Sequence, residues 1–158
     1  MAKDFQEQLE ARVMCFGDIE YLLKILSSVF KRIDPADADI LFDKRNVYFV
    51  FPSVNCTVHQ TIINPMINSD ARYSPLIPLW VINFSVDFEN KPKHEQIYTI
   101  AHELAHIFFE HGRGCGEDER KIARKIEIEA DGKVIEWGFV EELKKTPYNY
   151  LYGDGLKN

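Results

Sequence analysis

Two histidines four residues apart, His102 and His106, are the side chains in this sequence best suited to chemistry. On a helix, positions four apart lie on one face, one turn above the other. Two neutral imidazoles in that arrangement can hold one Zn²⁺ at about 2.0–2.1 Å. Glu103 follows the first histidine and could take a proton from a water molecule at the metal. The segment therefore matches the H-E-x-x-H pattern of zinc-dependent hydrolases.

A five-residue pattern also occurs by chance on ordinary helices, so its context must support it. The context predicts a helix over about 92–111, with Asn90 as N-cap and Pro92 in the first turn. Gly112 and Gly114 are expected to end it. Apolar residues recur inside it at helical spacing, namely Ile97, Ile100, Ala101, Leu104, Ala105 and Phe108.

The apolar neighbours of the two histidines imply that this face of the helix points inward. A carboxylate at Glu103 in such surroundings is costly unless a positive charge compensates it. A metal ion with its bound water supplies that compensation. The alternative is a metal-free amphipathic helix whose histidines are half-buried and hydrogen-bonded.

Catalytic zinc usually takes three protein ligands and leaves one position for water. A second helix is expected over about 117–137, before Gly138, and it carries the acids Glu127, Glu129 and Asp131. Helical phase separates these acids. The stripe through Glu127 and Asp131 is otherwise apolar, and it should face inward.

The stripe through Glu129 carries Lys125 and Lys133 at four-residue spacing, which is typical of a solvated face. We therefore expect Glu127 to be the third zinc ligand and Glu129 to lie in solvent. Asp131 is placed to accept the free N–H of a zinc-bound histidine, an arrangement that fixes the tautomer of the ligand.

Together these residues resemble the site of the gluzincin metallopeptidases, and the Glu-x-Glu-Ala-Asp string is most similar to the ImmA/IrrE-type family. The resemblance covers about residues 80–140 and rests on His102, Glu103, His106, Glu127 and Asp131. It implies a small zincin-like fold, Zn²⁺ as cofactor, and proteolysis of an intracellular, often regulatory, protein.

The whole chain has 158 residues, 46% hydrophobic and 28% charged, which is ordinary for one globular domain. Its net charge is −6 and it has no basic stripe, so a nucleic-acid partner is not expected. It also contains no apolar run long enough to span a membrane, and its polar N-terminus is not expected to be a signal peptide.

The sequence contains three widely spaced cysteines, Cys15, Cys56 and Cys115. An odd number of cysteines at such spacing argues against a disulfide framework and favours a reducing compartment, so we expect a cytoplasmic protein. Cys115 remains open as a fourth metal ligand, since it lies near the predicted site in the sequence.

The expected fold is a single α+β domain over 1–158, with N-terminal helices in 1–33, a small twisted sheet in 40–88 and the zinc-site helices in 92–145. The first helix is expected over 3–16. Asp18 is expected to cap the second, which should run to about Ile33 and stop at 34–37.

The expected sheet begins with a β-hairpin of 40–42 and 47–51, whose second strand is apolar on both faces and therefore central. A weaker strand is expected over 58–63, a loop over 64–78, and the clearest strand over 80–88. This last strand or its neighbour could border the substrate cleft, although a plain half-buried strand explains its pattern as well.

The function indicated is a zinc-dependent metallopeptidase acting on a protein or peptide, with Glu103 as general base. A second hypothesis is a catalytically silent module that zinc stabilises and that binds a partner protein. A third is a metal-free α+β interaction domain. The residue that stabilises the oxyanion stays open among His59, Tyr73, His94, His111 and Tyr148. The oligomeric state is not indicated.

Overall fold

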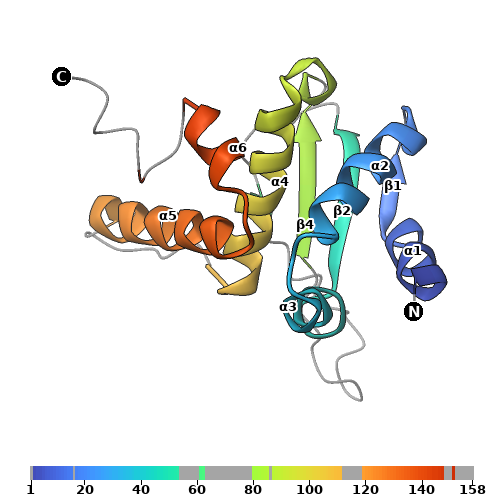
Figure 1. The fold of residues 1–158 in the computed structure, drawn as a ribbon, viewed down its shortest axis with the longest axis horizontal. Helices are drawn as coiled ribbons and strands as arrows, with labels where there is room; N and C mark the ends of the chain where they lie inside the picture. Colours follow the sequence, from blue (N-terminus) through green and yellow to red (C-terminus); the bar gives the residue numbers. More distant parts are fainter. Residues whose placement is uncertain are drawn as a thin grey trace.

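A computed structural model describes residues 2–15, 17–53, 61–62, 80–85, 87–111, 119–147 and 151. Helices and one small sheet make up this part of the chain, as expected for the α+β class (Figure 1). In chain order the elements are α1 (Ala2–Glu10), β1 (Val13–Cys15), α2 (Ile19–Phe30), α3 (Pro35–Asp39), the π-helix η1 (Ile40–Lys44), β2 (Val47–Ser53), β3 (Thr61–Ile62), β4 (Trp80–Ser85), the 3₁₀-helix η2 (Phe88–Asn90), α4 (Lys93–Phe108), α5 (Glu119–Glu136) and α6 (Val140–Lys145). The predicted loop over 64–78 lies outside the described residues.

The sheet has the strand order β1-β2-β4-β3. β1, β2 and β4 are parallel, and β3 runs antiparallel to β4. Phe49 of β2 pairs with Val13 on one side and Ile82 on the other, so the expectation of a central strand here is confirmed. β4 is also internal, and it ends at Ser85, earlier than expected.

The predicted β-hairpin over 40–51 is wrong. Residues Ile40–Lys44 continue α3 as a helix, and both partners of β2 are parallel strands. The expected stop at 34–37 is instead a helix start, because the Asp34 carboxylate accepts from the N–H of Ala36 and Pro35 occupies the first turn. Leu41 is fully buried by this helical path.

The first helix is shorter than expected, since Val13–Cys15 leaves it to pair with β2. The cap of α2 is confirmed: Asp18 accepts from the N–H of Tyr21. The cap predicted for the H-E-x-x-H helix is wrong, because Asn90 lies in η2 and α4 begins after Pro92. Its first turn is held instead by Gln96, whose side-chain nitrogen donates to two backbone carbonyls, of Glu89 and Lys91.

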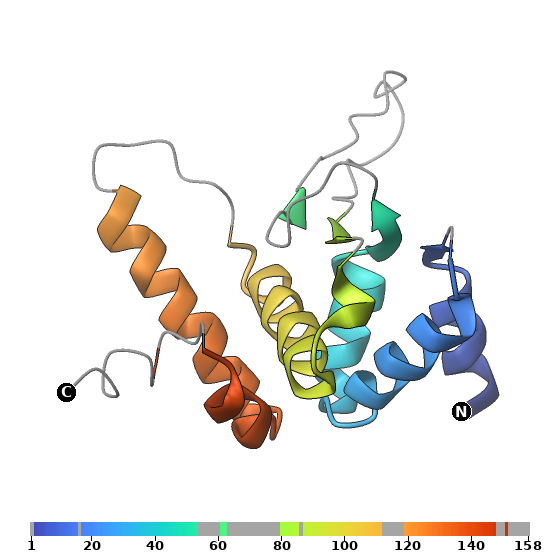
Figure 2. The ribbon, with the colours of Figure 1, turned by 90° about the horizontal axis from the view of Figure 1, so that it is seen from above.

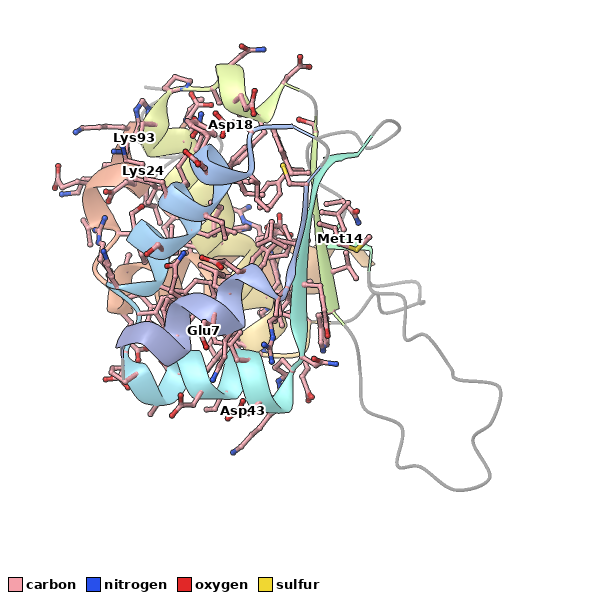
Figure 3. All side chains as sticks on the ribbon, turned by 90° about the vertical axis from the view of Figure 1, so that its right-hand side faces the viewer. Glu7, Met14, Asp18, Lys24, Asp43 and Lys93 are labelled. Carbon is pink, nitrogen blue, oxygen red and sulfur yellow. The ribbon has the colours of Figure 1, made fainter. Side chains whose placement is uncertain are left out.

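The helices lie on one side of the sheet (Figure 3), with α4 between α2 and α5 (Figures 1 and 2). Met14 of β1 points away from them and is 56% exposed. The hydroxyl of Tyr21 on α2 donates to Gln96 on α4 at 2.6 Å, which ties the two helices together. Within the described residues, no helix combines the length and apolar character needed to cross a bilayer.

A chain of aromatic rings fills the space between α2 and the sheet. Phe30 stacks on Phe42 at 4.7 Å, and Phe49 and Phe84 continue the contact into β2 and β4. On α4, Ile100, Leu104 and Ile107 are fully buried. Burying side chains of this size contributes about 1.5–3 kcal/mol each, so α4 is held firmly.

α5 runs across α4 and is followed by α6 (Figure 1). Its predicted end at Gly138 is confirmed: the glycine has φ 86°, and the N–H of Phe139 bonds back to the carbonyl of Val134. The prediction that Lys133 lies on a solvated face is wrong. Lys133 is 6% exposed, and its ammonium lies 2.8 Å from Asp37 and 2.7 Å from Glu136. Helical phase did not reveal that Asp37 of α3 and the ring of Phe108 on α4 meet Lys133 on this side of α5.

Candidate metal centre

The structure brings three of the predicted site residues together at the crossing of α4 and α5. His102 and His106 lie one turn apart on α4, with their Nε2 atoms 3.0 Å apart. Oε2 of Glu127, on α5, lies 2.9 Å from Nε2 of His102 and 3.4 Å from Nε2 of His106. Two imidazole nitrogens and one carboxylate oxygen therefore face a common point.

This set of atoms fits a zinc ion. Ligands held tetrahedrally at about 2.0–2.1 Å from zinc are separated from each other by roughly 3.3 Å. The three separations here are 2.9, 3.0 and 3.4 Å, so one matches that value and two are slightly shorter. Two imidazoles and one carboxylate are also the donor types of many catalytic zinc sites.

The pKa values of His102 and Glu127 are both shifted by their contacts within the cluster. Burial lowers the pKa of His102, but its hydrogen bonds to Asp131 and Glu127 outweigh this and raise the pKa to about 9. Burial raises the pKa of Glu127, but its hydrogen bonds from His102 and His106 bring it down to about 2. Both shifts favour a positive charge beside Glu127, which is the kind of charge that a bound cation would supply.

Asp131 lies at the other ring nitrogen of His102, where the sequence places it. The Oδ1 atom of Asp131 is 2.9 Å from Nδ1 of His102, and Asp131 is fully buried. Tyr98 was not predicted as part of the site. Its hydroxyl donates to the same oxygen of Asp131 at 2.7 Å and lies 3.3 Å from Nδ1 of His102. The spacing of four residues between Tyr98 and His102 is the sequence signal that could have identified it.

Glu103 is half-buried on α4, beside His102 in the sequence. Its negative charge contributes to the raised pKa of His102, after the larger effects of burial and of the two hydrogen-bonding carboxylates. Glu103 therefore lies close enough to the cluster to influence its charge.

His111, one of the candidates for an oxyanion donor, lies against the cluster and contacts Glu129. Nδ1 of His111 lies 3.0 Å from Nδ1 of His106, and its Nε2 lies 3.3 Å from Oε2 of Glu129. The Glu129 side chain is 47% exposed, as expected for the outer face of α5. Burial and the charge of nearby His106 lower the pKa of His111, against the opposing effect of Glu129.

The other candidates for an oxyanion donor are placed differently or not at all. His94 lies in the first turn of α4, eight residues before His102, which is about 12 Å along the helix axis. His59, Tyr73 and Tyr148 lie outside the described residues, as does Cys115, the candidate fourth ligand.

Comparisons of this chain with protein-family models, with curated proteins and with solved structures find no match.

Proposed function

We propose that this protein is a zinc-dependent metallopeptidase of the gluzincin type, with a zincin-like fold. The observation that carries the proposal is the convergence of His102 Nε2, His106 Nε2 and Glu127 Oε2 within 3.4 Å of one another. Glu103 stands next to the first of these residues on the same helix. The order of these residues along α4 is that of the H-E-x-x-H pattern, and this order supports the proposal.

Zinc bound at this site would lower the pKa of a water molecule toward about 7 and polarise a peptide carbonyl. Glu103 would accept the proton as that water attacks the carbonyl carbon, and would deliver it to the leaving amine. Asp131 would hold the Nδ1–H of His102, so that Nε2 keeps its lone pair for the metal. The buried carboxylate thus selects the tautomer that binds.

The substrate class that we propose is a protein or peptide, following the resemblance to metallopeptidases that cut intracellular regulatory proteins. An extended segment could add to the sheet as a further strand, which is a common mode of peptide recognition. Of the described strands, β3 lies at the edge nearer α5 and β1 at the opposite edge (Figure 2). β3 rather than β4 is therefore the candidate for this contact.

The test is Glu103→Gln, which removes the base and keeps the size of the side chain. Wild-type and variant proteins would be loaded with one equivalent of zinc and incubated with a proteome-derived peptide library, with cleavage products identified by mass spectrometry. We expect both proteins to hold zinc with similar affinity and only the wild type to cut. Cleavage by the variant at the wild-type rate would remove Glu103 from the mechanism.

A matched control is Glu95→Gln, which makes the same change in the first turn of α4, two turns before Glu103. It should bind zinc and cleave as the wild type does. If wild type binds zinc tightly but neither it nor the control cuts any peptide, the module stabilised by zinc becomes the better description. A wild-type protein that binds no zinc at all would contradict both the zinc-dependent peptidase and the module stabilised by zinc.

A further inference from the structure

His106 has a partner on the ring nitrogen that faces away from the cluster. We infer that His111 and Glu129 form a relay that positions His106 for metal binding, with His111 as the direct partner and Glu129 as its anchor. The inference rests on the proposed metal site and adds two positioning residues to it. Each histidine ligand would then have its own support, Asp131 for His102 and the relay for His106.

One assignment of protons satisfies every contact in the relay. If His106 binds metal through Nε2, its proton lies on Nδ1, which faces Nδ1 of His111 at 3.0 Å. Nδ1 of His111 must then accept, so the proton of His111 lies on Nε2. That nitrogen faces the carboxylate of Glu129 at 3.3 Å. The carboxylate therefore selects the tautomer of His111, and His111 selects the tautomer of His106.

The backbone at the end of α4 brings His111 back to His106. The N–H of His111 bonds to the carbonyl of His106 at 2.9 Å, and the N–H of Glu110 bonds to the carbonyl of Ile107 at 3.1 Å. This pair of bonds is the Schellman motif that ends many helices. As a result, both the backbone N–H and the ring of His111 contact the same residue, His106.

The turn is held in a conformation that its sequence does not favour. Glu110 has φ 56°, a left-handed value that is strained for a residue other than glycine. Arg45 contacts this turn twice: its guanidinium lies 2.6 Å from the Glu110 carboxylate and also donates to the carbonyl of Phe108. Strain of this kind persists where surrounding contacts maintain it, often at functional sites.

Packing fixes the ring of His111 as well. Its side chain is only 8% exposed, and the ring stacks on that of Phe109 with centroids 5.3 Å apart. Glu129 reaches it from α5, so the relay joins the two helices that carry the proposed ligands. A ring held on three sides can orient His106 without itself touching the metal.

The first measurement is zinc affinity, by competition with a chromogenic chelator at pH 7.5. His111→Ala should weaken binding about ten- to hundredfold, as loss of an outer partner does at other metal sites. His111→Asn should recover most of that loss, because Oδ1 of asparagine can accept from His106 where Nδ1 did. Glu129→Gln should weaken binding only about two- to fivefold, since its side chain is exposed to water. The control Glu141→Gln, at a side chain on α6 that is 71% exposed, should change nothing.

The second measurement separates positioning from general stability. In ¹⁵N–¹H spectra of the zinc-loaded protein, the Nδ1 proton of His106 should be visible and slow to exchange with water. It should exchange quickly in His111→Ala and slowly in His111→Asn. Equal affinity in wild type, His111→Ala and His111→Asn, with the proton unchanged, would overturn the relay while leaving the metal site intact.

Three further outcomes bear on the roles of His111 and Glu129. If His111→Ala does not fold, Glu129→Gln and His111→Asn carry the test. Affinity in Glu129→Gln equal to that in Glu141→Gln would remove the anchor. A failure of wild-type protein to bind zinc would instead overturn the proposed function, and the relay with it.

Discussion

Oδ1 of Asp131 lies 2.9 Å from Nδ1 of His102, at the ring nitrogen opposite the one that faces Glu127. Glu127 and Asp131 are one turn apart on α5, so a single stripe of that helix engages both nitrogens of one imidazole. The ring cannot turn over without losing both contacts. The orientation of His102 is therefore set before any metal binds.

Replacing Asp131 by asparagine should weaken zinc binding about ten- to hundredfold with the fold retained. Asparagine has the same shape, but its neutral amide is a poorer acceptor for the protons of His102 and Tyr98. Chelator competition measures the effect. Asp39→Asn makes the same change at an exposed position and should leave affinity unaltered; equal affinities for the two variants would contradict the role given to Asp131.

The hydroxyl of Tyr98 should support the same carboxylate. Tyr98→Phe removes a buried hydrogen bond of 2.7 Å and should lower the free energy of unfolding by about 1 kcal/mol. Urea denaturation of the metal-free protein measures this loss. In the Asp131→Asn background the same change should cost clearly less, because the two residues share one interaction. Additive losses would show that they act independently.

Zinc should stabilise the fold through Glu127 and much less through Glu129. At a free concentration one hundred times Kd, a ligand of the native state adds about 2.7 kcal/mol. For a chain of this size that raises Tm by about 5–10 °C. Glu127→Gln should lose most of the rise in a thermal scan and Glu129→Gln should keep most of it. Equal rises in the two variants would argue against Glu127 as a ligand.

The left-handed turn at Glu110 predicts an unusual order of stability. Glu110→Ala and Glu110→Gly both remove the ion pair with Arg45, so the difference between them reports the backbone alone. Because φ is 56° here, the alanine variant should be less stable than the glycine variant by about 1 kcal/mol. Denaturant unfolding of the pair gives this difference directly, and alanine equal to or better than glycine would contradict the turn.

The pair of Arg32 and Glu142 should make stability depend on pH below neutrality. Burial raises the pKa of Glu142, but its hydrogen bonds from Arg32 and the backbone outweigh this, so the folded pKa lies below the usual 4.5. A carboxyl whose pKa is lowered by folding contributes stability above its unfolded value and loses it as pH falls through the folded one. Wild type should exceed Glu142→Gln by about 0.5–1 kcal/mol at pH 7, and the gap should close as pH falls below 4.5.

Urea titrations at several pH values test this prediction. A gap that stays constant down to pH 3 would mean that the ion pair contributes nothing. The pair matters beyond its own energy because Arg32 also donates to the carbonyl of Gly138, the residue that ends α5. It thereby ties the segment that follows α2 to the turn that follows α5, the helix that carries Glu127.

Residues one helical turn apart could be assigned from the sequence, because their relation depends only on helix geometry. His102 with His106, and Glu127 with Asp131, are such pairs, and the structure has each pair on one helix face. The caps at Asp18 and Gly138 followed from local chemistry in the same way. The hairpin over 40–51 failed because an apolar run of that length reads equally well as a strand or as a buried helix.

By itself, then, the sequence determined which side chains share a helix face and where two of the helices begin or end, since those properties are local. Only the tertiary structure decided what each face meets. The path of α5 across α4 brought Glu127 to the histidines, and Asp37 of α3 paired with the buried Lys133. The left-handed turn at Glu110 returned His111 to His106, within reach of Glu129. Those contacts depend on how whole helices pack together, and the spacing of residues within one helix does not specify that packing.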